Sequence, residues 1–63
     1  MEELMVKAIR KFKKEYKGSE IRTCAVWESS GHGKNTTYAL FHIEYVEEPG
    51  AEYKSTEIAV SKE

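Results

Sequence analysis

The sequence predicts a small α+β domain in which one N-terminal amphipathic helix packs on a three-stranded antiparallel sheet. Three observations support this prediction. Apolar residues recur every three or four positions over residues 2–17, three later segments are rich in β-branched and aromatic residues, and Pro49-Gly50 separates the last two segments. The chain has 63 residues and a single cysteine, so we expect residues 1–63 to form one domain without disulfide bonds.

The first predicted element is a helix over residues 2–17. Its apolar residues fall on one stripe because they recur at spacings of three and four, and they are Leu4, Met5, Ala8, Ile9, Phe12 and Tyr16. Glu2 and Glu3 lie in the first turn, where negative charge suits the helix dipole. Gly18 should end the helix, because glycine readily adopts the left-handed conformation of a C-cap.

Three strands are predicted, over residues 20–28, 36–47 and 52–61. A glycine-rich loop over residues 29–35 joins the first two strands. Neither face of the first strand is cleanly polar, so the sequence leaves open which of its faces is buried.

A four-residue loop from Glu48 to Ala51 would fix the register of the last two strands, with Glu47 opposite Glu52. Pro49-Gly50 suits the centre of a type II turn in such a loop. This register brings apolar residues together on one face, as the pairs Phe41–Ile58, Ile43–Thr56 and Ala39–Val60. A slip of one residue would send one partner of each pair to the opposite face. We therefore expect the helix to cover the face that carries these pairs.

The other face of the predicted sheet also carries large apolar side chains. They are Trp27, Tyr38, Leu40, Val46 and Tyr53. One helix cannot cover both faces, and exposed apolar patches usually mark contact sites. We expect these residues to bind a partner protein or a second copy of the chain. The sequence thus indicates a small non-enzymatic interaction module, such as a regulator or inhibitor from a prokaryote or a virus.

The charge distribution supports an alternative function, which is nucleic-acid binding. The net charge is −1, but six basic residues and one acidic residue lie between Lys7 and Lys17. The side chains that could contact phosphates are Lys7, Arg10, Lys11, Lys14 and Lys34. From Glu44 onward the chain is mostly acidic, and this half would repel nucleic acid at longer range.

No motif predicts catalysis, a metal or a cofactor. Gly31-His32-Gly33-Lys34 resembles part of a phosphate-binding loop, but Asn35 follows the lysine where serine or threonine is required. The soft metal ligands Cys24, His32 and His42 lack the spacing of a metal site. We expect His42 to pair with Glu57 across the strands and Cys24 to be a partly buried apolar residue. A Cys–His nucleophile pair is the remaining enzymatic alternative.

The glycine-histidine loop between the first two predicted strands allows a comparison with a known domain family. Ser29-Ser30-Gly31-His32 and Phe41, in a helix–strand–strand order, are similar in topology to the double-stranded-RNA-binding domain. That similarity would imply RNA contacts. The chain lacks a proline beside Gly31 and a lysine cluster after the third strand, where the family makes its main phosphate contact. We assign no family from the sequence.

Localisation follows from the hydropathy of the chain. No apolar run is long enough to cross a bilayer, and charged residues interrupt the N-terminus from Glu2 onward. We expect a cytoplasmic protein, in the host cytoplasm if it is viral, with no membrane contact and no small-molecule ligand.

Overall fold

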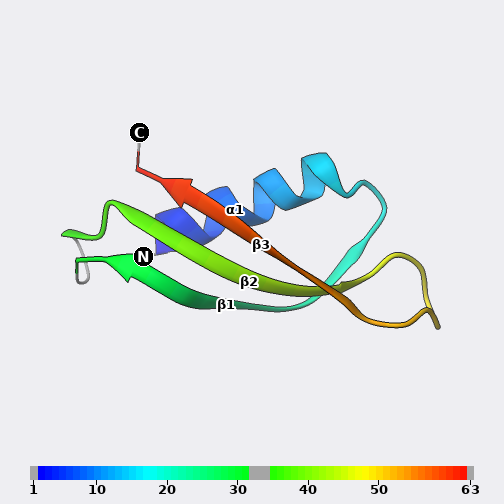
Figure 1. Cartoon of the computed structure of the whole chain (residues 1–63). Helices are drawn as coiled ribbons and strands as arrows, with labels where there is room; N and C mark the ends of the chain where they lie inside the picture. The colour runs from blue at the N-terminus through cyan, green and yellow to red at the C-terminus, as the bar shows by residue number, and fades with distance from the viewer. Residues whose placement is uncertain (1, 32–34, 63) are drawn as a thin grey trace.

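The computed structural model describes residues 2–31 and 35–62 (Figure 1). The elements follow in the order α1 (Glu2–Glu15), β1 (Glu20–Ser30), β2 (Tyr38–Val46) and β3 (Lys54–Ser61). β2 lies between β1 and β3 in one antiparallel sheet. The predicted α+β fold, with one helix on a three-stranded sheet, is therefore confirmed. The helix ends at Glu15 rather than at residue 17.

α1 packs against β3 and β2 on one face of the sheet, which we call the helix face (Figure 1). Leu4, Ala8 and Phe12 are the buried residues of the helix. The Phe12 ring stacks on Tyr16 with ring centroids 4.8 Å apart and meets Tyr45 edge-on at 5.1 Å. Such aromatic pairs contribute about 0.5–1.5 kcal/mol beyond the burial of their area, so Phe12 joins the helix to the central strand.

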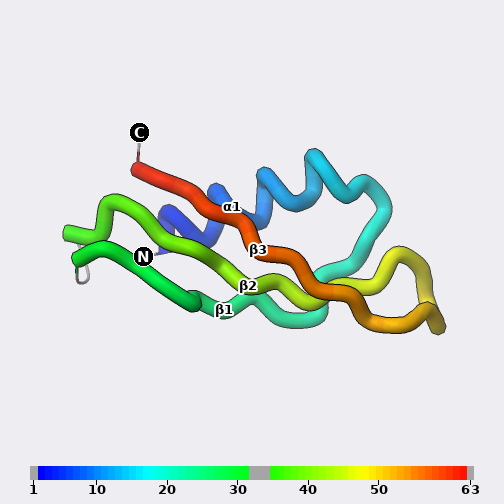
Figure 2. The backbone as a smooth tube through the Cα atoms, viewed as in Figure 1, coloured from blue at the N-terminus to red at the C-terminus, as the bar shows by residue number. Residues whose placement is uncertain are grey.

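The β2–β3 hairpin has the predicted register and turn. Ala39 pairs with Val60, Phe41 with Ile58 and Ile43 with Thr56. In the turn, the Ala51 amide donates to the Glu48 carbonyl at 3.1 Å, and Gly50 has a φ of 86°, as the third residue of a type II turn requires. The hairpin extends past the C-terminal end of the helix (Figure 2).

The expected pairing of Glu47 with Glu52 is wrong. The described ladder between the two strands ends at Tyr45 and Lys54. Glu47 instead accepts a hydrogen bond from the Lys54 ammonium group, with Nζ and Oε1 2.7 Å apart. The connection is longer than predicted because Glu47 and Glu52 would repel each other if they lay directly opposite across the strands. The observed arrangement instead brings the opposite charges of Glu47 and Lys54 together.

The structure settles the facing of β1, which the sequence left open. Ile21 pairs with Tyr45 and Cys24 with Ile43, so both lie on the helix face. The register shifts between Ile21 and Thr23 and again between Val26 and Glu28. Arg22 and Trp27 are thus bulge residues, and each bulge shifts the alternation of the side chains after it.

Candidate functional site

Within residues 2–31 and 35–62, no helix or strand covers the face of the sheet opposite α1, and we call it the open face. Directly opposed residues of antiparallel strands share a face, so the register defines its members. From β1 they are Glu20, Thr23, Ala25, Glu28 and Ser30; from β2, Tyr38, Leu40, His42, Glu44 and Val46; and from β3, Ser55, Glu57, Ala59 and Ser61. Trp27 lies on the same face because its ring stacks on His42.

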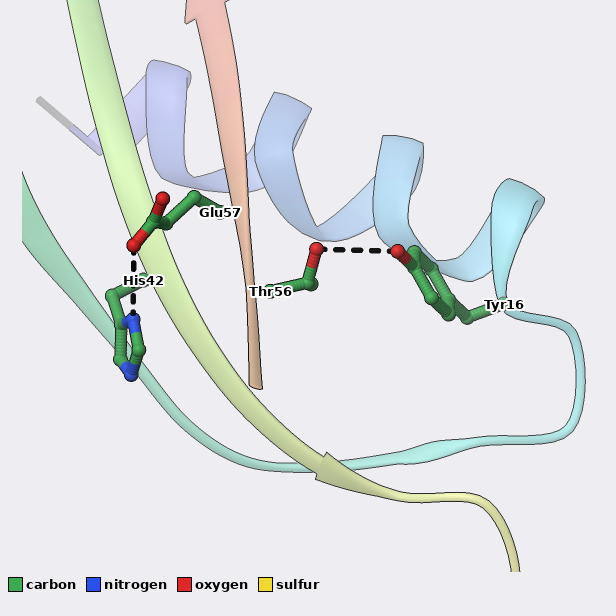
Figure 3. Close-up of polar contacts among 4 residues, drawn as sticks. All are labelled: Tyr16, His42, Thr56 and Glu57. Atoms are coloured by element: carbon green, nitrogen blue, oxygen red, sulfur yellow. Dashed lines mark hydrogen bonds and ion pairs between the residues drawn. The ribbon is translucent and has the colours of Figure 1, made fainter. Parts of the chain in front are cut away.

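A row of side chains crosses the three strands at the middle of the open face. The Trp27 ring lies parallel to the His42 ring, with centroids 4.5 Å apart and an angle of 6° between their planes. His42 Nδ1 lies 3.8 Å from Glu57 Oε2, on the side of the sheet away from Tyr16 and Thr56 (Figure 3). The predicted His42–Glu57 pair is confirmed by the register. Stacking fixes the orientation of Trp27 while its side chain stays 59% exposed.

A second stacked pair involves the other bulge residue, Arg22. Its guanidinium carbon lies 4.4 Å from the centroid of the Tyr53 ring, a distance typical of a cation–π contact. Tyr53 immediately precedes β3, whose first residue, Lys54, pairs with the buried Tyr45. Continued alternation of side chains places Tyr53 on the side of the open face. Tyr53 is 57% exposed. Each bulge of β1 therefore presents a side chain that is stacked on a ring of the open face.

The five residues predicted to form a protein interface fall into two groups on this face. Tyr38 and Leu40 lie toward one end of β2 and Val46 at the other, with His42 and Glu44 between them. Val46 lies six positions after Leu40, which is about 20 Å along a strand. Tyr38 is 42% exposed, and Leu40 pairs with Glu28, the residue after Trp27. We call Trp27, Tyr38 and Leu40 the Trp27 cluster.

Charge separates the two sides of the molecule. The acidic residues on the open face are Glu20, Glu28, Glu44 and Glu57, and among its described residues Arg22 is the basic one. The exposed residues of α1 include four basic ones, Arg10, Lys11, Lys13 and Lys14. A surface with several acidic groups repels polyanions, so the open face is unsuited to nucleic acid.

The helix lysines have a structural role that the sequence did not predict. Lys7 Nζ donates to the carbonyl oxygens of Ser61 at 2.9 Å and Lys62 at 3.0 Å, and Lys11 Nζ donates to that of Ala59 at 3.4 Å. Two of the residues expected to contact phosphates thus lie along the outer edge of β3. Arg10 and Lys14 are exposed, and Lys34 lies outside the described residues.

The enzymatic alternative depended on a thiol beside an imidazole. Cys24 lies on the helix face and His42 on the open face, so they cannot share a proton. Burial raises the pKa of the Cys24 thiol, which lowers its thiolate fraction. Within residues 2–31 and 35–62, no three His, Cys, Asp or Glu side chains gather as a metal site requires. His32 lies outside the described residues.

The sequence matches no family model, and neither a curated protein nor a solved structure is significantly similar to the chain. In the part of the chain that the structure describes, no helix has the length and apolar character needed to cross a membrane. Fold and site therefore define a small α-β-β-β domain with an acidic, aromatic open face.

Proposed function

We propose that this protein is a non-enzymatic binding module that holds a partner protein on the Trp27 cluster. The observation that carries the proposal is the Trp27 ring, which is stacked on His42 yet 59% exposed. Such an aromatic side chain loses little conformational freedom when it is buried in an interface. Tryptophan is also among the residues whose truncation in an interface most often costs about 2 kcal/mol or more.

The surroundings of the cluster suggest the chemistry of the partner. Glu28 flanks Trp27 in the sequence, and Glu57 lies beside His42. A complementary surface would place an apolar pocket over Trp27 and basic residues around it. By occupying such a surface, the protein would act as a regulator or inhibitor. We propose that it works in the cytoplasm, or in that of a host if it is viral, because a lone thiol suits a reducing compartment.

Affinity capture from the source cell tests this proposal. Wild type and Arg10→Ser, a control on the helix, should retain the same protein, and Trp27→Ala and Leu40→Ser should lose it. Circular dichroism would verify that each variant folds. On addition of the purified partner, the emission of Trp27, the sole tryptophan, should shift to the blue and resist quenching by iodide. Unchanged capture by both cluster variants would contradict the proposal.

The same experiment separates the nucleic-acid alternative. The nucleic-acid alternative would be favoured if nuclease treatment removed the captured material. It would also be favoured if Arg10→Ser and Lys14→Ser lost this material while Leu40→Ser retained it. Such binding should also weaken steeply as salt is raised. Lys7 and Lys11 already donate hydrogen bonds to β3 and the open face is acidic, so we rank protein binding first.

A further inference from the structure

We propose that two copies of the chain associate through β1, pairing antiparallel about a two-fold axis at Ala25 to form one continuous six-stranded sheet. The proposal concerns the edge of the sheet. It does not depend on the function proposed for the open face, and either one can fail alone.

The two edges of the sheet are unequal. Lys7 and Lys11 donate hydrogen bonds to outer carbonyl groups of β3. β1 has 11 residues, contains no lysine and lies at the edge away from α1 (Figure 1). The unpaired N–H and C=O groups of an edge strand are a template for pairing with another chain. β1 is therefore the edge that is available for association.

The order of faces along β1 is palindromic about Ala25. Counted outward from Ala25 in either direction, the first and fourth side chains lie on the helix face, and the second, third and fifth lie on the open face. The two directions match because one bulge lies on either side of Ala25. Outward from Ala25 these residues are Cys24, Thr23, Arg22, Ile21 and Glu20 in one direction, and Val26, Trp27, Glu28, Ser29 and Ser30 in the other. A two-fold axis perpendicular to the sheet preserves faces, so every residue meets one on its own face.

This register also pairs opposite charges. Arg22 of each copy lies opposite Glu28 of the other. Two ion pairs per dimer form when each guanidinium group turns from the Tyr53 ring of its own chain to Glu28 of the second copy. Cross-strand pairs of opposite charge stabilise sheets, and like charges directly opposed destabilise them. On the helix face, Cys24 lies opposite Val26 of the second copy. Val26 is 37% exposed in the single chain, so the second copy would cover apolar surface that α1 leaves in water.

Neighbouring registers lose the Arg22–Glu28 pairs and oppose residues that lie on different faces. An axis at Cys24 sets Glu20 opposite Glu28 of the second copy, and it opposes Arg22 to Val26, which lie on different faces. An axis at Val26 opposes Cys24 to Glu28, again on different faces. Bulges ordinarily disrupt the pairing of an edge strand. With the axis at Ala25 the bulge of one copy faces that of the other, so both strands depart from regular geometry at the same place.

Charge reversal tests the proposal. Sedimentation velocity should show that wild type forms dimers as the protein concentration is raised from about 5 μM to about 1 mM. We expect a weak dimer because the interface is below the standard size of about 1,600 Å². Arg22→Glu and Glu28→Arg should each raise the dissociation constant at least about tenfold, because two attractive pairs become repulsive. An equimolar mixture of the two variants should dimerise again, since both pairs between them are attractive.

Three controls accompany the reversal. Glu20→Arg makes the same change of charge as Glu28→Arg. Because Glu20 lies opposite the uncharged Ser30 of the second copy, this variant should leave the dimer intact. Tyr53→Ala removes the contact of Arg22 within the chain but keeps the charge of Arg22, so as a control it should not weaken the dimer. Leu40→Ser would dissociate a dimer formed face to face and should leave the edge dimer unchanged. A monomeric wild type, or a mixture of the two charge variants that stays monomeric, would overturn the proposal.

A cross-link gives a second, independent measurement of the register. Directly opposed residues of antiparallel strands have Cα atoms about 4.5–5.5 Å apart, within the range that a disulfide spans. Val26→Cys with oxidised glutathione should give a covalent dimer through Cys24, and wild type should not, because two Cys24 thiols would lie on a longer diagonal. Covalent dimers of wild type in equal yield would contradict the register.

Discussion

Phe12 is fully buried between Tyr16 and Tyr45, where the helix meets the central strand. Replacing a buried phenylalanine by alanine costs about 3–5 kcal/mol. A single domain of this size rarely has more than about 3–5 kcal/mol of stability, so Phe12→Ala should be largely unfolded at 25 °C. Far-ultraviolet circular dichroism in urea would measure this. Val6→Ala, on the exposed side of the helix, is the matched control and should shift the midpoint little; an unshifted midpoint for Phe12→Ala would contradict the packing described.

The thiol of Cys24 should make stability depend on pH. Burial raises its pKa in the folded chain. The unfolded chain therefore loses this proton first, and between the two pKa values it binds fewer protons than the folded chain. The free energy of unfolding contributed by Cys24 is thus complete below the unfolded pKa and falls as the pH rises through the folded one. Urea titrations at several alkaline pH values should show a smaller fall for Cys24→Ala, which has no thiol to titrate.

At the residue scale, the sequence predicted which aromatic side chains lie on the open face but not how they are held. The composition of the strands identified Trp27 and Tyr53. Their contacts with His42 and Arg22 depend on the two bulges of β1, which shift the phase of the alternation. The burial pattern of the structure shows the shift, because the half-buried residues Ile21 and Cys24 lie three positions apart, which a regular strand does not allow on one face.

At the scale of elements, the helix and the β2–β3 hairpin were predictable because two independent signals agreed. The turn at Pro49-Gly50 and the apolar alternation gave the same register, and Phe41–Ile58 pairing confirms it. β1 was less predictable, since it lies at an edge, where burial imposes little pattern: only Ile21 and Cys24 are even half-buried. The role of the helix lysines depends on the tertiary position of β3, which the sequence does not specify.

The contacts of Lys7 and Lys11 with β3 lead to a prediction about that edge. Lysines and covering side chains prevent edge strands from pairing with other chains. Lys7→Ser with Lys11→Ser should therefore increase association through β3, seen as thioflavin-positive aggregates after incubation at high concentration. Lys13→Ser with Lys14→Ser makes the same change of net charge on exposed residues and is the matched control. Equal aggregation of both double variants would assign the effect to charge alone.

The whole molecule has an elongated shape, with principal extents of 39 × 18 × 13 Å. One helix and one sheet leave half of the sheet surface in water, and the buried hydrophobic residues are few: Leu4, Ala8, Phe12, Ala39, Phe41, Ile43, Tyr45, Ile58 and Val60. A domain of about 60 residues buries only about 60% of the surface that its unfolded chain exposes. Association through β1 would add to this small core.

If association contributes to stability, thermal unfolding must depend on concentration. Mass action makes the melting temperature of a folded dimer rise with protein concentration. Unfolding entropy is about 2.1 cal/mol/K per residue, and a tenfold change in concentration corresponds to about 1.4 kcal/mol, so a dimer of this size should gain roughly 5 °C per tenfold increase. Calorimetry across a hundredfold range would measure the slope for wild type and for Arg22→Glu. The slope should disappear in the variant, because like charges then face each other at both ends of the pairing, and it should return when the variant is mixed with Glu28→Arg. A melting temperature of wild type that is independent of concentration would mean that the single chain is stable without its edge being paired.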